Sequence, residues 1–258
     1  MKKDYAEVFR SGAAVQKYDD QVYSAGTFAS AIDARQRVWL RRLVQDSFAG
    51  RPVVQQDFAC GTGRAIRALE GTVEQAHGYD TSETMLARAR EVGTSGRFHL
   101  IAADGPVPRP EPAGDHPVLV TIFRLLLNTS EDVHDRAVAF AAAALPTPAS
   151  GLLVVENHGN SRSLRHLSRW RKRGNEWFNE LSTAQVRDLL SRHDFQLEAV
   201  HGFAVLPKAA YRRRWTAPLA RLIDDWASRR SWLAPVSVDV LYLARRTQPG
   251  GHRDRPAA

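Results

Sequence analysis

Short apolar stretches of the kind that form buried strands alternate with segments whose apolar residues recur at helical spacing. Strands are predicted at residues 53–59, 73–80, 97–103, 118–123, 151–157, 195–203 and 238–246. Helices are predicted at residues 29–48, 63–70, 82–91, 131–145, 161–173 and 182–193. Because strands and helices alternate, we expect an α/β fold with a mostly parallel sheet covered by helices on both faces.

Two stretches interrupt this pattern. Five prolines between residues 106 and 117 exclude regular structure there. A basic insertion containing tryptophan, residues 207–235, separates the last two predicted strands. We expect one domain at 1–246, made of a helical lid at 1–50, a core at 51–160, substrate-cap elements at 161–235 and a last strand at 236–246, followed by a disordered tail at 247–258.

The composition is that of an ordinary globular protein, with 43% hydrophobic and 25% charged residues among 258. The longest apolar run, residues 137–145, ends at Pro146 and is far shorter than the ~20 residues that a membrane-spanning helix needs. No apolar stretch follows the basic first residues, so we expect no signal peptide. The single cysteine, Cys60, excludes an internal disulfide and a cysteine-rich metal site. We expect a reduced, cytoplasmic protein without a membrane partner.

Charge is distributed unevenly along the chain, whose formal net charge is +8. From residue 161 onward 19 basic residues oppose 9 acidic ones, whereas the first 160 residues are close to neutral. A basic region of this kind can attract an acidic small substrate, a phosphate group or nucleic acid. An arginine-rich surface can equally be solvated without a partner, and both interpretations stay open here.

The candidate chemistry lies at the ends of the first three predicted strands. The segment Asp57-Phe58-Ala59-Cys60-Gly61-Thr62-Gly63-Arg64 follows the first strand and opens a helix. Its small residues allow a sharp turn and a close approach to a ligand. Asp80 ends the second strand, where a carboxylate can accept hydrogen bonds from ribose hydroxyls, and Asp104 follows the third. Because ligands of open α/β sheets gather at this edge, we predict that the three segments form one site.

These residues resemble a known family. The series Asp57-x-Ala59-Cys60-Gly61-Thr62-Gly63, then Tyr79-Asp80-x-Ser82-x-x-Met85-Leu86, then Ala103-Asp104 is similar to the motifs of class I S-adenosylmethionine (SAM)-dependent methyltransferases. The similarity covers about residues 50–160 and extends to the last pair of strands. It implies a Rossmann-like fold with a seven-stranded sheet whose last strand is antiparallel, and S-adenosyl-L-methionine as the cofactor. One departure is Ala59, where the family most often has glycine.

The resemblance also implies roles for individual residues. The glycine-rich turn would lie against the methionine part of SAM, Asp80 would hold the ribose, and Asp104 would border the adenine. The implied cofactor-binding residues are Asp57, Ala59, Cys60, Gly61, Gly63, Asp80, Thr81, Met85, Asp104, Gly105 and Phe123. Phe123 and Arg124 occupy the family's position beside the substrate and SAM. No metal is intrinsically required for methyl transfer.

The nearest alternative within this fold is an NAD-dependent enzyme. Its fingerprint needs a small residue three positions after the second glycine, where this chain has Ile66. SAM carries no pyrophosphate, so an anion-binding helix start is not needed. The residues therefore favour SAM over a dinucleotide, and a non-catalytic SAM-fold binding protein remains a further alternative.

Methyl transfer needs a positioned nucleophile and, where that group must lose a proton, a general base. His158, after the fifth strand, is the candidate base because imidazole titrates near neutrality; the alternative is that it only caps the strand end. Glu156 is a weaker candidate, and His166 is expected at the surface. Cys60 is expected to be inert: a reactive thiolate needs an electropositive partner, and Arg64, the candidate for that partner, is supported by no second motif.

Two tyrosines of the N-terminal segment, Tyr18 and Tyr23, are further candidates. The segment resembles stretches that close over SAM in small-molecule methyltransferases. Tyrosine rings can favour the sulfonium by cation–π contact, worth ~0.5–2 kcal/mol. Ordinary packing of an amphipathic lid is an equal alternative.

We expect the substrate to be a small molecule methylated on oxygen or nitrogen, with an acidic metabolite or natural-product intermediate as the candidate class. An N-terminal lid precedes the cofactor motif, and the insertion before the last strand could roof a pocket. The alternative is an RNA methyltransferase that uses the basic C-terminal face, where tryptophan occurs among basic residues in residues 162–177 and 212–215.

Overall fold

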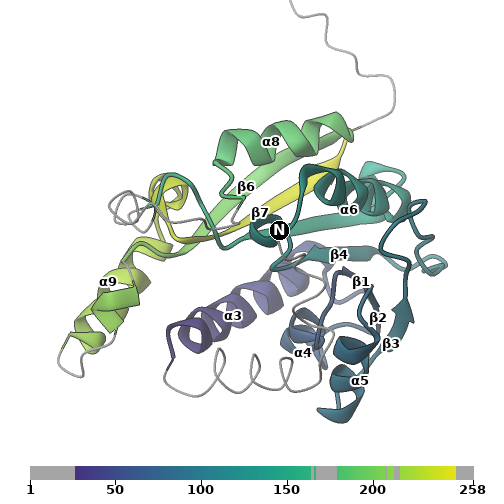
Figure 1. The fold of residues 1–258 in the computed structure, drawn as a ribbon, viewed down its shortest axis with the longest axis horizontal. Coiled ribbons are helices and arrows are strands. Elements are labelled where there is room, and N and C mark those ends of the chain that lie inside the picture. Colours follow the sequence, from purple (N-terminus) through teal and green to yellow (C-terminus); the bar gives the residue numbers. More distant parts are fainter. Residues whose placement is uncertain (1–26, 164–165, 167–178, 207, 212–215, 248–258) are drawn as a thin grey trace, which may run out of the picture.

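The computed structural model describes residues 27–163, 166, 179–206, 208–211 and 216–247. Its centre is a seven-stranded sheet with the strand order β3-β2-β1-β4-β5-β7-β6 (Figure 1). The strands are β1 (Val54–Phe58), β2 (Gln75–Asp80), β3 (Arg97–Leu100), β4 (Val118–Ile122), β5 (Gly151–Asn157), β6 (Phe195–Ala204) and β7 (Asp239–Arg246). Neighbouring strands pair in parallel except at β7, which runs antiparallel to both β5 and β6.

Helices cover both faces of this sheet, α6 and α8 on one face and α3, α4 and α5 on the other (Figure 1). The helices are α3 (Phe28–Phe48), α4 (Arg64–Leu69), α5 (Glu83–Glu91), α6 (Glu131–Ala144), α8 (Thr183–Arg192) and α9 (Ala217–Ser228), with short 3-10 turns η1 (Leu126–Asn128), η2 (Pro148–Ser150), η3 (Lys208–Tyr211) and η4 (Ser231–Val236). Strand β4 is buried on both faces and is apolar except for Thr121: Val120 and Ile122 pack toward α6, and Leu119 toward α3 and α4.

The predicted fold class is confirmed, including the antiparallel last strand. The predicted end of the third strand is wrong, because β3 stops at Leu100 rather than at residue 103. Arg136 of α6 donates to the carbonyl oxygens of Ala102 (2.8 Å) and Ala103 (2.6 Å), which ties these residues to α6 rather than to the strand ladder. Most of the helix predicted at 161–173 lies outside the described residues. Within the described ranges, no helix is both long and apolar enough to span a membrane.

Helix α3 belongs to the helical layer under the sheet. The Thr27 hydroxyl accepts a hydrogen bond from the amide of Ser30 (3.1 Å) and so caps its first turn. Its buried apolar residues pack against α4 and the sheet; they are Ile32, Leu40, Val44 and Phe48. This packing brings two polar residues of the same helix, Asp33 and Gln36, to the carboxyl ends of the strands.

A buried polar network joins α3, α4, β5 and β7 at this edge. The Arg64 guanidinium, at the start of α4, donates to Glu156 (2.7 Å), Asp33 (3.0 Å) and Gln36 (2.9 Å). The side-chain amide of Gln36 donates in turn to Glu156 (3.0 Å) and Asp239 (2.8 Å). Glu156 is 1% exposed and Asp239 is 3% exposed, so the network lies inside the protein. Every one of its hydrogen bonds links elements far apart in sequence.

The two buried carboxyl groups of this network differ in charge. Burial opposes the ionisation of Glu156, but the guanidinium groups of Arg64 and Arg124 outweigh it and lower its pKa. Burial, and then repulsion from Glu156, raise the pKa of Asp239 well above its ordinary value. Ionisation is therefore favoured at Glu156, the partner of Arg64, and disfavoured at Asp239.

A third buried carboxyl group lies in the central strand. Asp57 of β1 is paired in register with Thr121 of β4, whose hydroxyl donates to Asp57 Oδ1 (2.6 Å). Burial raises the pKa of Asp57 to about 7, although the Thr121 hydrogen bond and the charge of Arg64 act in the opposite direction. The folded protein therefore binds a proton that the unfolded chain releases near pH 4.

We expect Asp57→Asn to change how stability depends on pH. Between about pH 4 and pH 7 the folded wild type holds a proton on Asp57 and the unfolded chain does not, so the stabilisation from this group is lost as pH rises. The free energy of unfolding of wild type, measured with urea on the cofactor-free protein, should therefore fall relative to that of Asp57→Asn across this range, at roughly 1.4 kcal/mol per pH unit at most. Above about pH 7 the difference should level off. A difference independent of pH would contradict this assignment.

We expect Glu156→Gln to destabilise the protein. Breaking a buried ion pair costs roughly 3–5 kcal/mol, and since Asp33 remains a partner of Arg64 we expect a loss of about 2–4 kcal/mol in urea unfolding at pH 7.5. Glu74→Gln, an exposed change of the same chemistry at the start of β2, is the control and should stay within about 0.5 kcal/mol of wild type. Equal effects of the two substitutions would show that the Arg64–Glu156 pair is not a main support of the fold.

Candidate active site

The turn between β1 and α4 presents backbone rather than side chains. Ala59, Gly61 and Gly63 have positive φ values of 58°, 54° and 79°. A Cβ atom on Gly63 would lie 2.7 Å from the side chain of Thr94, so only glycine fits there, whereas the corresponding space at Gly61 is open. Thr94 therefore closes the side of the turn at Gly63, whereas the space beside Gly61 is open and a ligand can approach the main chain there.

Asp80 lies next to this turn. Its carboxylate accepts hydrogen bonds from the amides of Gly61 (2.7 Å) and Ser82 (2.9 Å). Burial raises the pKa of Asp80, and these backbone hydrogen bonds oppose that shift. A carboxylate offers about four lone-pair sites, and Asp80 is only partly buried, so it retains acceptor capacity for further donors.

The residues after β2 form the first turn of α5. The Ser82 hydroxyl accepts a hydrogen bond from the amide of Met85 (3.3 Å) and caps this helix. Met85 is 8% exposed, and Thr81 is exposed beside Asp80. This end of the site therefore combines a buried thioether side chain with an exposed polar residue.

Asp104 and Gly105 lie in the loop that follows β3, and both are exposed. Because Asp80 and Leu100 are register partners in β2 and β3, this loop leaves the sheet at the same edge as Asp80. The three carbonyl oxygens that Arg136 binds, those of Ala102, Ala103 and Pro106 (2.8, 2.6 and 3.2 Å), surround the two residues and fix their main chain.

The chain turns sharply after β4. Phe123 is buried, and the Arg64 guanidinium lies over its ring, 5.3 Å from the centroid. Arg124 adopts a left-handed conformation (φ 60°), and its amide donates to Glu156 (2.9 Å). The carboxylate that holds the turn after β1 thus also holds the turn after β4.

His158 is buried directly after β5, at the edge where β1, β2 and β4 end. Glu156 is fully engaged by Arg64, Gln36 and Arg124, which leaves it no role as a base. His166 is exposed and contacts Glu180. The candidates Tyr18 and Tyr23 lie outside the described residues.

The environment of Cys60 agrees with an inert thiol. Burial, followed by the charges of Asp80 and Asp57, raises its pKa well above the usual value, so the thiolate is disfavoured. Arg64, the one sequence candidate for an activating cation, is directed to Glu156 and Asp33 instead.

A nucleoside with an amino-acid tail fits these features. The open main chain at Gly61 allows close contact, Asp80 has acceptor capacity for sugar hydroxyls, and the loop at Asp104 and Gly105 borders the far side. The chemistry of these residues therefore fits SAM. No cluster of three or more His, Cys, Asp or Glu side chains suited to a metal occurs in the described part of the chain.

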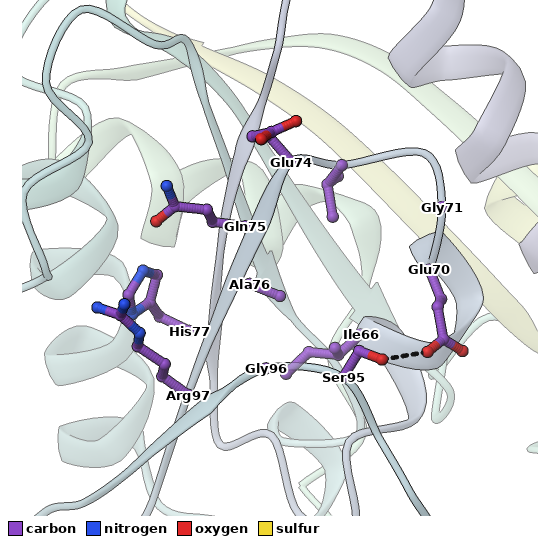
Figure 2. Close-up of a pocket in the computed structure, with 11 residues that line it drawn as sticks. Ile66, Glu70, Gly71, Glu74, Gln75, Ala76, His77, Ser95, Gly96 and Arg97 are labelled. Atoms are coloured by element: carbon purple, nitrogen blue, oxygen red, sulfur yellow. Dashed lines mark hydrogen bonds between the residues drawn. The ribbon is translucent and has the colours of Figure 1, made fainter.

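A separate surface hollow of about 320 Å³ lies elsewhere (Figure 2). It is lined by Gln75 and Arg97, the first residues of β2 and β3, and by Glu70, which is hydrogen-bonded to Ser95 (Figure 2). It therefore lies at the amino edge of the sheet, opposite the edge that carries Asp80, and is not part of the candidate site.

Sequence reasoning missed the network under the site. Arg64 was weighed only as a neighbour of Cys60, and neither Asp33 nor Gln36 was singled out. One local signal was available: Glu156 is a carboxylate within a strand that is otherwise apolar up to that residue, and a buried carboxylate requires a partner.

Comparisons with known proteins agree with this geometry. Residues 56–143 match a family model described as a methyltransferase domain. No curated protein gives a significant sequence match.

Three solved structures illustrate the likeness of fold. A TehB-like SAM-dependent methyltransferase from Corynebacterium glutamicum is 15% identical, with 92% of this chain and 100% of that chain covered and a TM-score of 0.55. The magnesium protoporphyrin IX methyltransferase of Synechocystis PCC 6803, with bound SAH, is 13% identical, with coverage of 92% and 99% and a TM-score of 0.54. A SAM-dependent methyltransferase from Mesorhizobium loti is 21% identical, with coverage of 83% and 100% and a TM-score of 0.50.

At these identities the solved structures establish the fold, and the family model adds the methyltransferase domain across the turn, Asp80 and Asp104. The same strand ends that offer an open main chain and a free acceptor to a nucleoside fall inside the matched residues. The chain thus contains a methyltransferase domain on a class I-type fold, and it is an enzyme that uses S-adenosyl-L-methionine as its cofactor.

Proposed function

We propose that this enzyme transfers the methyl group of SAM to an oxygen or nitrogen atom of a small, acidic molecule. The observation that carries the cofactor half of the proposal is the contact between Asp80 and the amide of Gly61, beside the open face of the turn. The solved magnesium protoporphyrin IX methyltransferase supports a small-molecule substrate, because 99% of its chain aligns with this one.

In this proposal the cofactor is held mainly by strand ends. The main chain at Gly61 and Gly63 contacts the amino-acid part, and Asp57 and Cys60 support the turn from below. Asp80 accepts hydrogen bonds from the ribose hydroxyls, with Thr81 beside it. Met85, Asp104 and Gly105 border the adenine. Ala59 takes the place of a glycine at positive φ, which its small side chain tolerates.

SAM supplies an electrophilic methyl group on a sulfonium. The protein's task is to place the acceptor atom in line with that group, which can be worth ~7–11 kcal/mol in favourable cases. Phe123 and Arg124 lie where β4 ends and would form the substrate side. His158 would accept the proton released by a hydroxyl or ammonium acceptor. We further propose that Tyr18 and Tyr23, which precede α3, close over the cofactor.

The basic C-terminal part of the chain supports an acidic substrate. From residue 161 onward the sequence has 19 basic against 9 acidic residues, and such an excess of positive charge would attract an anionic substrate. The cap elements at 161–235 would supply the substrate contacts, and the core at 51–160 those of the cofactor.

We expect Asp80→Asn to weaken SAM binding about 10–100-fold in isothermal titration calorimetry. Hydrogen bonds to a charged group contribute roughly 1.5–3 kcal/mol, which corresponds to this range. Asp115→Asn, an exposed change in the proline-rich loop, is the matched control and should bind as wild type does. Unchanged affinity of a folded Asp80→Asn protein would remove Asp80 from the cofactor site.

The reaction itself is tested by incubating the enzyme with methyl-labelled SAM and an extract of small metabolites. We expect label in a low-molecular-weight product, and His158→Asn should lower its rate of formation about 10²–10⁴-fold while SAM affinity is kept. His116→Asn, an exposed histidine, should leave the rate unchanged. Label recovered only in ribonuclease-sensitive material would contradict the small-molecule proposal, and equal rates for both variants would contradict the role of His158.

A further inference from the structure

Helix α9 has two faces of opposite character. One face is buried against the end of β6 and consists of Ala220, Asp224 and Ala227. The adjoining face is an exposed apolar stripe with helical spacing, formed by Leu219 (59% exposed), Leu222 (66%), Ile223 (38%) and Trp226 (50%). In Figure 1 this helix extends away from the sheet, beside α3. An amphipathic helix normally buries such a stripe, and here it faces outward.

The orientation of α9 is held by specific bonds. Asp224 accepts hydrogen bonds from the amides of Val205 (3.0 Å) and Leu206 (3.3 Å), just after β6. Arg35 of α3 pairs with Asp225 (2.9 Å) and lies 3.8 Å from Asp224. The polar side of the helix is therefore tied to the body, and the apolar stripe is presented to the outside.

The stripe continues into a region rich in tryptophan and arginine. Trp232, in η4, is 68% exposed, and the Arg230 guanidinium lies over the ring of Trp226, 3.9 Å from its centroid. The basic residues of this segment whose side chains are described are Arg221, Arg229 and Arg230, and its two acidic residues, Asp224 and Asp225, both pair with Arg35. The described surface around the stripe therefore carries a net positive charge.

The apolar stripe and the arginines around it indicate which kind of partner this surface can bind. A second copy of the chain would bring two cationic surfaces together, which like-charge repulsion opposes. Nucleic acid would satisfy the arginines but would leave Leu219 and Leu222 in water. An anionic lipid surface satisfies both, since acyl chains accept leucine, isoleucine and tryptophan while the head groups attract arginine.

We propose that α9 and η4 form a docking surface for an anionic lipid bilayer, on which α9 lies in the plane of the interface. No helix in the described residues is long and apolar enough to span a membrane. A helix that lies in the plane of the interface needs only one apolar stripe and flanking cations. Because Ala204 pairs with Asp239, and Asn157 with Val240, β6 ends at the same edge as β5. Docking therefore turns the edge that carries the active site toward the lipid.

The test is co-sedimentation of the full chain with vesicles. We expect binding to vesicles of phosphatidylcholine with 30% phosphatidylglycerol, weak binding to phosphatidylcholine alone, and a decrease as salt rises. Leu222→Glu should weaken the binding at least tenfold. Val38→Glu, which places the same charge on an exposed valine (51%) of α3, is the matched control and should bind as wild type does.

Several outcomes would overturn the proposal. Absence of binding to anionic vesicles by wild type is one, and equal binding by Leu222→Glu and wild type is another. A dimer in sedimentation velocity that Leu222→Glu dissociates, without vesicle binding, would assign the stripe to a second copy. Circular dichroism and thermal unfolding of both variants confirm that loss of binding does not reflect unfolding, because both positions are more than half exposed.

Discussion

The site depends on the ion pair between Arg64 and Glu156. Arg64 is the first residue of α4, directly after the turn at Gly63, whereas Glu156 belongs to β5, two strands away in the sheet. The pair crosses β4, and Glu156 is buried (1% exposed), so no solvent can replace Arg64 as the partner of this carboxylate. The same carboxylate accepts the amide of Arg124. One buried charge thereby fixes the turns after β1 and β4 relative to each other.

The cofactor side and the substrate side are built differently. On the proposed cofactor side, the open main chain at Gly61 lies beside one carboxylate, Asp80, which the same main chain orients. Recognition through main chain requires few particular side chains. On the proposed substrate side, by contrast, the contacts would come from side chains after β4 and β5, whose identity determines what they can bind.

Local sequence patterns were sufficient to predict the strands of the sheet and the turn that precedes α4. The apolar run of β5, bounded by Gly151 and Asn157, gave its limits directly, and the spacing of small residues placed the turn before α4. The end of β3 was misjudged because Arg136, more than thirty residues later, captures the carbonyl groups beyond Leu100. The network around Arg64 could not be read from the sequence either, since its partner Glu156 is 92 residues away and no local period links them.

The position of the insertion follows from the antiparallel β7. A parallel strand must be reached by a crossover to the opposite edge of the sheet, but β6 and β7 are antiparallel, so the chain leaves and re-enters at one edge. That edge is the carboxyl edge of β5, where His158 and the turns after β1 and β4 also lie. The segment between β6 and β7 therefore begins and ends at the same edge of the sheet as the candidate site, whatever its sequence. Because the sheet needs only the two strands, this segment can vary without loss of the fold, and here it carries leucine, tryptophan and arginine.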